Sequence, residues 1–309
     1  MSSLIVLGSG PAGLTAAIYA VRGGISTQIV EGPVPGGQLT LTGEVENYPG
    51  FPQTILGPNL MSLMRDQAER FNAEFIQGDA TGVEFAEKPF KVNVGKNIHA
   101  ADSVIVATGA VSQWLGLESE KRLRGKGVSS CAICDGFFFK NKDVVVVGGG
   151  DTAVEEAIFL ANLARTVTVI HRRDQLRAIK KIQERAFQKE NIKFLWNSAI
   201  EDILGETHVE GIRIKDLKTK RTHEQRCEGV FIAIGYRPNT EILKGQLELD
   251  EAGYIKTYSG TQTSREGVFA AGDVADRVYR QAITAAASGC QAAIDASKYL
   301  ASLTAGHRA

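Results

Sequence analysis

The stretch Leu4-Ile5-Val6-Leu7-Gly8-Ser9-Gly10-Pro11-Ala12-Gly13 decides the fold of the N-terminal part of the chain. Its first four residues form an apolar run typical of a buried β-strand, and the glycines that follow end that strand. An apolar helix is predicted over 14–21, and then a strand over 27–30 that ends at Glu31. This order of strand, glycine turn, helix, strand and acid predicts the β-turn-α-β unit of a dinucleotide-binding domain.

The three glycines of this turn have separate tasks in such a domain. Gly8 permits the tight turn, Gly10 lets a pyrophosphate approach the backbone, and Gly13 lets helix and strand pack closely. Unpaired N–H groups at the helix start then face the phosphates, while Glu31 can accept a hydrogen bond from a ribose hydroxyl. Glycine-rich turns also serve plain strand–helix packing, but the complete ordered pattern favours nucleotide binding.

The same pattern occurs a second time. A strand predicted over 143–147 runs into Gly148-Gly149-Gly150-Asp151-Thr152-Ala153, followed by a helix over 154–164 and a strand over 167–170. Ala153 stands where the first copy has its third glycine, and it is still small enough for close packing. The chain is therefore a duplication of one architecture.

The second copy differs from the first at the end of its second strand. Instead of an acid it has His171-Arg172-Arg173, with Arg177 shortly after. Arginines bind a ribose 2′-phosphate through charge-assisted hydrogen bonds, whereas an acid would repel it. A solvated basic patch is the alternative, but the position at the strand end favours NADPH over NADH. Two dinucleotide sites suggest one exchanging and one permanent cofactor, and a tightly held flavin is the natural hydride acceptor.

The duplication also predicts the domain organisation. Apolar strands over 103–108, 230–234 and 268–271 are each followed by glycine, and a long helix over 280–301 closes the chain. Six apolar residues of that helix fit one broad face: Ile283, Ala286, Ala287, Ala293, Ile294 and Leu300. We predict an α/β protein with two Rossmann-like dinucleotide-binding domains, in which an NADPH domain over 114–244 is inserted into a discontinuous FAD domain over 1–113 and 245–309. The polar stretch 112–126 is expected to be irregular.

Composition excludes several classes of protein. Lys plus Arg and Asp plus Glu both number 35 in the 309 residues, so no global positive field attracts nucleic acid or a membrane. No apolar run approaches the roughly 18 residues of a spanning helix. The first residues lack the basic region and cleavage site of a signal peptide, so a cytoplasmic location is expected.

The Cys131-Ala132-Ile133-Cys134-Asp135 segment admits two interpretations. A Cys-x-x-Cys pair can hold half of a zinc site, but two further ligands are needed, and neither Cys227, Cys290 nor the five His residues supply a matching pair. No metal is therefore predicted. The other interpretation is a redox-active dithiol, with Asp135 as proton donor or acceptor, or as an ordinary helix N-cap. Cys227 and Cys290 are expected to be structural.

The dithiol lies at the entrance of the second nucleotide domain, just before its first strand. Nicotinamide and dithiol therefore belong to one body, while a flavin would belong to the other. Both must reach the same flavin ring, which predicts that they take turns.

With these motifs, the chain closely resembles the low-molecular-weight thioredoxin reductases over nearly its whole length. The most discriminating block is Cys131 to Phe138. The other matching blocks are Gly8 to Gly13, Gly36-Gly37-Gln38-Leu39, Glu44-Val45-Glu46-Asn47, Ala107-Thr108-Gly109-Ala110, Gly148 to Glu156, His171-Arg172-Arg173-Asp174, Ala233-Ile234-Gly235, Pro238-Asn239-Thr240, Phe269 to Val274, and Tyr279-Arg280-Gln281-Ala282-Ile283.

The resemblance implies the cofactor sites. The FAD site would comprise Gly8, Ser9, Gly10, Pro11, Ala12, Gly13, Glu31, Gly37, Gln38, Leu39, Asn47, Thr108, Gly109, Ala110, Gly272, Asp273, Arg280, Gln281 and Ala282. The NADPH site would comprise Gly148, Gly150, Asp151, Thr152, Ala153, His171, Arg172, Arg173, Arg177, Ile234 and Gly235. Asp273 would bind the ribityl and pyrophosphate region, and the helix after Arg280 would direct its positive end at the flavin.

The resemblance also implies the reaction. Electrons would pass from NADPH through FAD to a Cys131–Cys134 disulfide and then to thioredoxin. Cys134 would face the flavin, Cys131 would exchange with the partner disulfide, and Asp135 would act as general acid-base. A homodimer is implied, together with a rotation between domains about hinges near 110–117 and 235–247.

Other protein classes share parts of this pattern. Alkyl hydroperoxide reductase flavoproteins carry an additional N-terminal region that is not expected here. Ferredoxin–NADP reductases of this fold lack the dithiol, and small-molecule dithiol oxidases would turn over oxygen without NADPH. A zinc-stabilised nucleotide-binding module is the non-enzymatic alternative, and a colourless protein containing zinc would support it.

Overall fold

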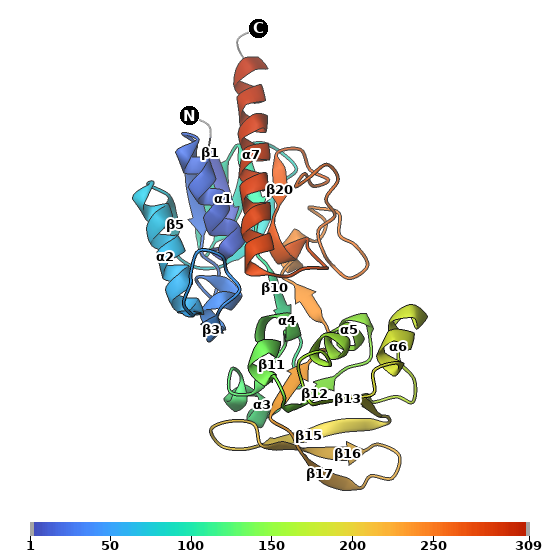
Figure 1. The fold of residues 1–309 in the computed structure, drawn as a ribbon. Coiled ribbons are helices and arrows are strands. Elements are labelled where there is room, and N and C mark those ends of the chain that lie inside the picture. Colours follow the sequence, from blue (N-terminus) through green and yellow to red (C-terminus); the bar gives the residue numbers. More distant parts are fainter. Residues whose placement is uncertain (1–2, 307–309) are drawn as a thin grey trace. The chain divides into compact units, whose positions relative to one another are not determined.

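The computed structural model describes residues 3–306, and the chain divides into two compact units (Figure 1). Unit 1 comprises residues 1–111 and 237–309, and unit 2 comprises residues 112–236. The chain passes between them at two places, where β10 (Ala110–Ser112) and β19 (Tyr236–Pro238) pair as a two-stranded sheet.

Unit 1 is built on a parallel five-stranded sheet in the order β20-β9-β1-β2-β5. Its strands are β1 (Ser3–Leu7), β2 (Ser26–Val30), β5 (Glu74–Ile76), β9 (Ser103–Val106) and β20 (Val268–Ala270). The helices are α1 (Pro11–Arg22), α2 (Gly57–Arg70) and α7 (Ala282–Gly306), with short 3-10 turns η1 (Gly37–Leu41), η3 (Glu241–Leu243) and η4 (Gly272–Val274). A hairpin of β3 (Glu44–Val45) and β4 (Ile55–Leu56) and an antiparallel sheet of β6 (Ala80–Glu84), β7 (Phe90–Val94) and β8 (Asn97–Ala101) complete it.

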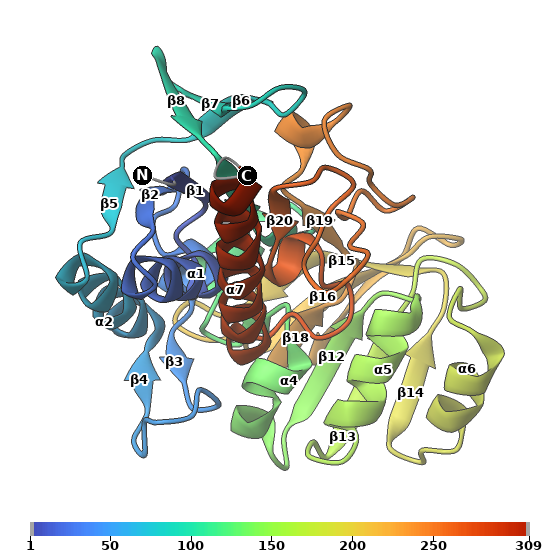
Figure 2. The same cartoon turned by 90° about the horizontal axis from the view of Figure 1, so that it is seen from above.

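Alternation along β1 creates two cores, because successive side chains of a strand point to opposite faces of the sheet. Leu4 and Val6 pack with α1 and α7, which lie side by side in both views (Figures 1 and 2). Ile5 and Leu7 pack on the other face with residues of β6 and β7, Phe90 among them. All four β1 side chains are at most 1% exposed, which explains why the run is apolar without a polar alternation.

Unit 2 repeats this plan with a parallel sheet in the order β11-β18-β12-β13-β14. Its strands are β11 (Val128–Ser129), β12 (Asp143–Val147), β13 (Thr166–Ile170), β14 (Ile192–Leu195) and β18 (Gly229–Ile232). Its helices are α3 (Glu118–Leu123), α4 (Ala132–Asp135), α5 (Asp151–Leu160) and α6 (Lys180–Phe187), with the 3-10 turn η2 (Gly136–Phe139). An antiparallel sheet of β15 (Ser198–Leu204), β16 (Gly211–Asp216) and β17 (Thr222–Arg226) covers one face.

The predicted duplication is confirmed strand by strand. The central strands β1 and β12 pair with their neighbours in parallel, β1 with β2 and β9, and β12 with β13 and β18. Val144 and Val146 pack with α5, whereas Val145 and Val147 pack against the β15–β16 sheet, just as the β1 side chains divide between two faces. Only the fifth strand differs, because β20 comes after the other four strands of its sheet in sequence, whereas β11 comes before the other four strands of its own sheet. The α/β class with two dinucleotide-binding folds is therefore the observed one.

The unit boundaries differ from the predicted residues 114 and 244. The second crossing lies at 236–237, eight residues earlier than expected. Residues 237–244 belong to unit 1 because Leu243 is fully buried in its core and the Asn239 N–H donates to the Gly109 carbonyl at 3.0 Å. No local signal in the sequence reports these long-range contacts. The expectation that 112–126 is irregular is also wrong for Glu118–Leu123, which forms α3.

The predicted apolar face of α7 is half wrong. Ala286, Ala293 and Leu300 are buried, but Ile283, Ala287 and Ile294 are exposed. The helix buries its small residues instead, because it lies so close to α1 that a Cβ on Gly289 would overlap the Ala12 carbonyl. Within residues 3–306, no helix combines the length and the apolar character needed to cross a membrane.

Candidate active site

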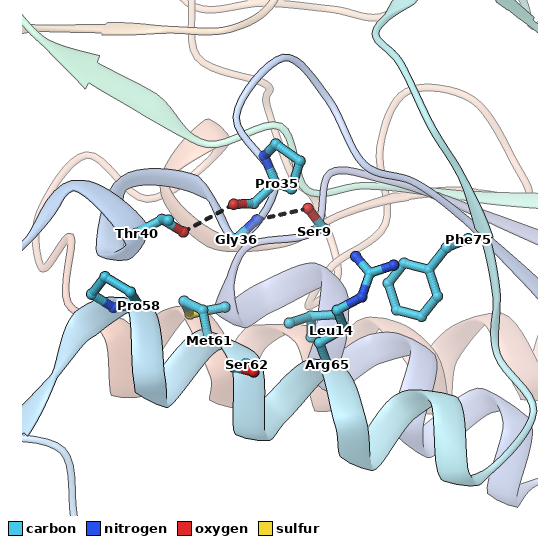
Figure 3. A pocket seen from close by; sticks show the side chains of 10 residues that line it. All are labelled: Ser9, Leu14, Pro35, Gly36, Thr40, Pro58, Met61, Ser62, Arg65 and Phe75. Carbon is cyan, nitrogen blue, oxygen red and sulfur yellow. Dashed lines mark hydrogen bonds between the residues drawn. The ribbon is translucent and has the colours of Figure 1, made fainter.

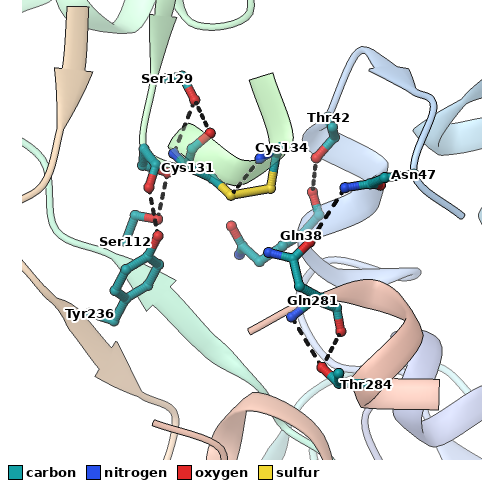
Figure 4. Close-up of a disulfide and its surroundings, with 11 residues drawn as sticks. Gln38, Thr42, Asn47, Ser112, Ser129, Cys131, Cys134, Tyr236, Gln281 and Thr284 are labelled. Atoms are coloured by element: carbon teal, nitrogen blue, oxygen red, sulfur yellow. Dashed lines mark hydrogen bonds between the residues drawn. A yellow bond between two sulfur atoms is a disulfide. The ribbon is translucent and has the colours of Figure 1, made fainter. Parts of the chain in front are cut away.

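Cys131 and Cys134 form a disulfide in unit 2, with their Cα atoms 5.3 Å apart (Figure 4). Cys131 is the N-cap of the short helix α4, and its Sγ accepts a hydrogen bond from the Cys134 N–H at 3.2 Å. The sequence interpretation as a dithiol pair is thus matched by a formed bond. Among residues 3–306, no cluster of three or more His, Cys, Asp or Glu residues is placed to hold a metal ion.

The backbone before the disulfide is fixed by hydroxyl groups. The Ser129 Oγ accepts from the Cys131 N–H at 3.0 Å, and the Tyr236 hydroxyl donates to the Ser130 carbonyl at 2.6 Å. The Ser130 and Ser112 hydroxyls lie 2.8 Å apart. Ser112 and Tyr236 stand at the two crossings between the units, so the disulfide segment is tied to both connecting strands.

Asp135 follows the disulfide, and burial raises the pKa of its carboxyl group, although a hydrogen bond with Ser129 opposes that shift. A raised pKa keeps a larger protonated fraction near neutral pH, which suits a group that transfers protons. The alternative interpretation as an N-cap is not supported, because Cys131 caps α4 and the Asp135 side chain makes no capping bond to the following turn. Asp135 is thus a buried carboxyl group with a raised pKa, next to Cys134 in the sequence.

Unit 1 holds the first glycine turn in the geometry of a phosphate-binding loop. Gly8 has a φ of +107°, and a Cβ at this position would overlap the Ala107 carbonyl oxygen. Around Gly10, by contrast, the nearest atom to such a Cβ is the Gly36 carbonyl oxygen at 4.0 Å. The backbone at Gly10 is therefore bare on the side where a pyrophosphate would approach.

Ser9 connects this turn to the loop that carries Gly37, Gln38 and Leu39. Its hydroxyl donates to the Glu31 carbonyl at 2.8 Å. It also accepts from the Gly36 N–H at 3.0 Å, as Figure 3 shows. These bonds hold the glycine turn against the end of β2 and against the loop before η1. Ser9, Gly36 and Thr40 line a cavity of about 190 Å³. Three of the predicted site segments thus meet, although they are separated in sequence.

Sequence reasoning missed Arg65, which lies on α2 and lines the same cavity. Its guanidinium forms an ion pair with Glu31, which is only 5% exposed, and lies over the Phe75 ring at 4.0 Å. Glu69 holds the same guanidinium from the next helical turn at 2.8 Å. Glu31 is thus a paired carboxylate held in a fixed orientation. Nothing in the local sequence around Arg65 indicates this long-range pairing.

The remaining predicted residues of unit 1 gather at the strand ends and the start of α7. Asn47 donates to the Gln281 side chain at 3.4 Å, and Gln281 exchanges hydrogen bonds with Thr284 in the first turn of α7 (Figure 4). The Thr108 hydroxyl donates to the Asn239 carbonyl, and the Asn239 amide returns a bond to the Thr108 carbonyl, each at 2.8 Å. Asn239 belongs to a block that the sequence singled out without giving it a role.

In unit 2 the second glycine turn repeats the steric features of the first. Gly148 has a φ of +152°, and a Cβ there would overlap the Ala233 carbonyl. In the first turn, a Cβ on Gly8 would overlap the Ala107 carbonyl in the same way. Ala153 is fully buried, as close helix–strand packing requires. Arg172, Arg173 and Arg177 at the end of β13 are exposed.

His171 behaves differently from the arginines that follow it. It is 5% exposed, and its ring fills the space where a Cβ of Gly149 would lie. Burial lowers the pKa of His171, and the charges of the three arginines act in the same direction, so the ring is neutral at neutral pH. The structure therefore places His171 as packing for the glycine turn, with the arginines as the exposed basic groups.

Known proteins share this arrangement. The pyridine nucleotide-disulphide oxidoreductase family matches residues 2–289. A thioredoxin reductase from Rickettsia typhi (strain ATCC VR-144 / Wilmington) is 52% identical over 304 residues, which cover 97% of this chain and 98% of that protein. The chain belongs to the pyridine nucleotide-disulphide oxidoreductases, within the thioredoxin reductases.

Solved structures of thioredoxin reductases agree with this assignment. That from Streptococcus pyogenes MGAS5005 is 42% identical, covers 97% of this chain and 98% of its own, and has a TM-score of 0.92. That from Lactococcus lactis in the FR conformation is 40% identical, covers 98% and 100%, and has a TM-score of 0.66. The predicted resemblance to low-molecular-weight thioredoxin reductases is thus confirmed, and the chain is an oxidoreductase.

Asp273 gives a test of the site in unit 1 that needs no turnover. Burial raises the pKa of Asp273 to about 6, and Asp276 adds to the shift, while the Asp273 Oδ1 atom has no hydrogen-bond partner in the described part of the chain. Because the folded pKa is raised, this group contributes stability at low pH that is lost as pH rises through about 6. We expect Asp273→Asn to remove a loss of roughly 2.5 kcal/mol between pH 4 and pH 8 in cofactor-free protein.

Urea denaturation of cofactor-free wild type and Asp273→Asn across this pH range measures the difference. Asp66→Asn, which alters an exposed carboxylate on α2, is the control and should follow the wild-type profile. Parallel profiles for wild type and Asp273→Asn would contradict the assignment of a strained buried carboxyl group.

Proposed function

We propose that this chain is an NADPH-dependent thioredoxin reductase that uses FAD and the Cys131–Cys134 disulfide. The observation that carries the proposal is the combination in unit 2 of a formed disulfide with a dinucleotide-binding fold whose second strand, β13, is followed by exposed arginines. Ferredoxin–NADP reductases of this fold lack the disulfide. A zinc module does not account for a second, complete dinucleotide-binding fold.

The residues of unit 1 fit an FAD molecule. The bare backbone at Gly10 suits the pyrophosphate, and Glu31 stands where a ribose hydroxyl donates. The unpartnered Asp273 Oδ1 is a buried acceptor that the hydroxyls of a ribityl chain would satisfy. When bound, FAD supplies an acceptor for hydride and a donor of two electrons to the disulfide.

In unit 2, Arg172, Arg173 and Arg177 would hold the 2′-phosphate of NADPH, with the pyrophosphate at the start of α5. The remaining predicted contacts are supported by position alone. Gly150, Thr152 and Ala153 form the turn and first helical residues, while Ile234 and Gly235 follow β18. The exposed arginines are the part that discriminates NADPH from NADH.

The dithiol would reduce thioredoxin by thiol–disulfide exchange. The Cys131 thiolate attacks one sulfur of the partner disulfide, and the partner's other sulfur leaves as a thiolate that takes a proton. Cys134 then attacks the Cys131 sulfur, which restores the disulfide and releases the second partner thiol. Asp135 would carry the proton. Ile133 and Phe137 are 58% and 64% exposed beside the disulfide and offer apolar contacts to a protein partner.

Rotation between the units would let nicotinamide and dithiol use one flavin in turn. The solved relatives support this rotation. The structures from Streptococcus pyogenes and Lactococcus lactis have similar identities of 42% and 40%, but their TM-scores are 0.92 and 0.66. The second structure is described as being in the FR conformation. Such a spread is expected when a family is captured with its two domains in different orientations.

Hydrogen bonds near the two crossings support hinge segments that are shorter than the sequence suggested. The N–H groups of Leu115 and Gly116 donate to the buried Glu120 carboxylate at 2.8 and 2.9 Å, which fixes this end to unit 2. Asn239 and Leu243 are fixed to unit 1. We therefore place the hinges at 110–113 and 235–238, within the wider ranges expected from sequence. A homodimer and a cytoplasmic location complete the proposal.

The deciding experiment is NADPH oxidation with thioredoxin as the acceptor, compared with oxygen alone. Purified protein reconstituted with FAD should be yellow, and thioredoxin should accelerate NADPH oxidation well above the oxygen background. Absence of NADPH oxidation with either acceptor would favour a dithiol oxidase, which turns over oxygen without NADPH, and a spectrum without flavin bands would exclude the proposal.

A further inference from the structure

The segment 171–179, which carries the arginines, is attached to the second glycine turn by three backbone donors. The N–H groups of Arg177 and Ala178 donate to the Gly149 carbonyl at 2.7 and 3.2 Å. The Ile179 N–H donates to the Asp151 carboxylate at 2.8 Å. Two of the three attachments therefore use the turn's backbone, and only the third uses a side chain.

An aspartate is unexpected at the start of α5, beside the second glycine turn. Asp151 is the first residue of α5, where the phosphates of a dinucleotide are expected to meet the positive end of the helix. A carboxylate there repels an anionic ligand by its charge. Because one carboxylate oxygen is occupied by the Ile179 N–H, the side chain points to the basic segment as its partner.

Arg177 connects this attachment to ligand selection. It stands between Leu176 and Ala178, which are buried in the core of unit 2, while its own side chain is exposed. A Cβ built on Gly150 would lie 4.0 Å from the Arg177 Nη2 atom, so the guanidinium is located over the glycine turn. Fixing the backbone at 177–179 thus fixes the direction of this charge.

We propose that Asp151 is a positioning residue that selects for the 2′-phosphate by holding the Arg177 segment, and that it is not itself a nucleotide contact. This role rests on the proposed use of NADPH. It replaces the expectation that Asp151 binds the cofactor directly. The two roles differ in which ligand loses affinity when the side chain is removed. Loss of a direct contact would weaken ligands with and without the 2′-phosphate alike, whereas loss of a positioning residue weakens mainly the ligand that carries it.

The test measures binding of 2′,5′-ADP and of 5′-AMP to the FAD-loaded protein by calorimetry. We expect Asp151→Ala to raise the Kd for 2′,5′-ADP about tenfold and the Kd for 5′-AMP less than about twofold. Asp151→Asn retains the acceptor oxygen for Ile179 and should bind 2′,5′-ADP at least as well as wild type. Thermal unfolding of each variant shows that both remain folded.

A double-mutant cycle with Arg177→Ala isolates the mechanism. If Asp151 acts through Arg177, then Asp151→Ala should add no further loss of 2′,5′-ADP affinity in the Arg177→Ala background. Unchanged or tighter binding by Asp151→Ala, equal weakening of both ligands, or additive losses in the cycle would overturn the proposal. Wild-type protein that binds 5′-AMP as tightly as 2′,5′-ADP would instead overturn the NADPH assignment itself, before any variant is compared.

Discussion

Cys134→Ser is expected to lower thioredoxin turnover by roughly 10³-fold or more while leaving flavin reduction by NADPH intact. The physical reason is that hydride transfer to flavin needs only the dinucleotide sites, whereas thioredoxin reduction needs both sulfurs of the Cys131–Cys134 pair. Steady-state assays with thioredoxin and rapid anaerobic reduction by NADPH measure the two parts separately.

Cys131→Ser should abolish thioredoxin turnover equally, but it leaves a single thiol at Cys134. If Cys134 is the sulfur that faces the flavin, its thiolate should give a long-wavelength absorption band with oxidised flavin, in Cys131→Ser only. Cys290→Ser is the matched control, because Cys290 lies on α7 outside the disulfide. A band in Cys134→Ser instead would exchange the two roles, and full turnover by either variant would exclude the dithiol mechanism.

Replacing both Arg172 and Arg173 with alanine is expected to raise the KM for NADPH about 100-fold and to change the KM for NADH little. Each charge-assisted hydrogen bond is worth roughly 1.5–3 kcal/mol, and the sum is reduced because the two side chains are exposed and share one phosphate. Their position at the end of β13 corresponds to Glu31 at the end of β2, where a ribose would lie.

Lys180→Ala with Lys181→Ala provides the charge-matched control for this prediction. These residues start α6 and are exposed, so the control removes the same net charge a few residues beyond the strand end. It should change the two KM values only slightly. Equal increases for NADPH and NADH in the Arg172 and Arg173 variant would mean that the 2′-phosphate is bound elsewhere.

Buried Cys227 shows why cysteine chemistry depends on surroundings more than on residue type. Its side chain is 2% exposed in the core of unit 2, and burial raises the pKa of the thiol to about 12. Such a thiol carries almost no thiolate at neutral pH and is unreactive. The expectation that Cys227 is structural, made from its isolation in the sequence, agrees with this burial.

Much of the site could be predicted because its constraints are local. A positive φ at Gly8 and Gly148 excludes other residues whatever lies far away in sequence, and so the glycine pattern is visible in the sequence itself. The same holds for the close spacing of Cys131 and Cys134, which allows a disulfide within one helical turn. The duplicated order of strands and turns follows from these local features.

What only the tertiary structure decided are the contacts between distant segments. Arg65 and Glu31 are 34 residues apart, and no local sequence pattern predicts their ion pair. The boundary at 236–237 depends on the burial of Leu243 in the core of unit 1. The buried face of α7 depends on how closely α1 approaches it. Asp151 belongs to the predicted motif, yet its partner Ile179 was revealed only by the fold. The sequence by itself determined which local geometries form, because sterics and hydrophobic periodicity act over a few residues, whereas partner choice depends on packing that all of the chain shares.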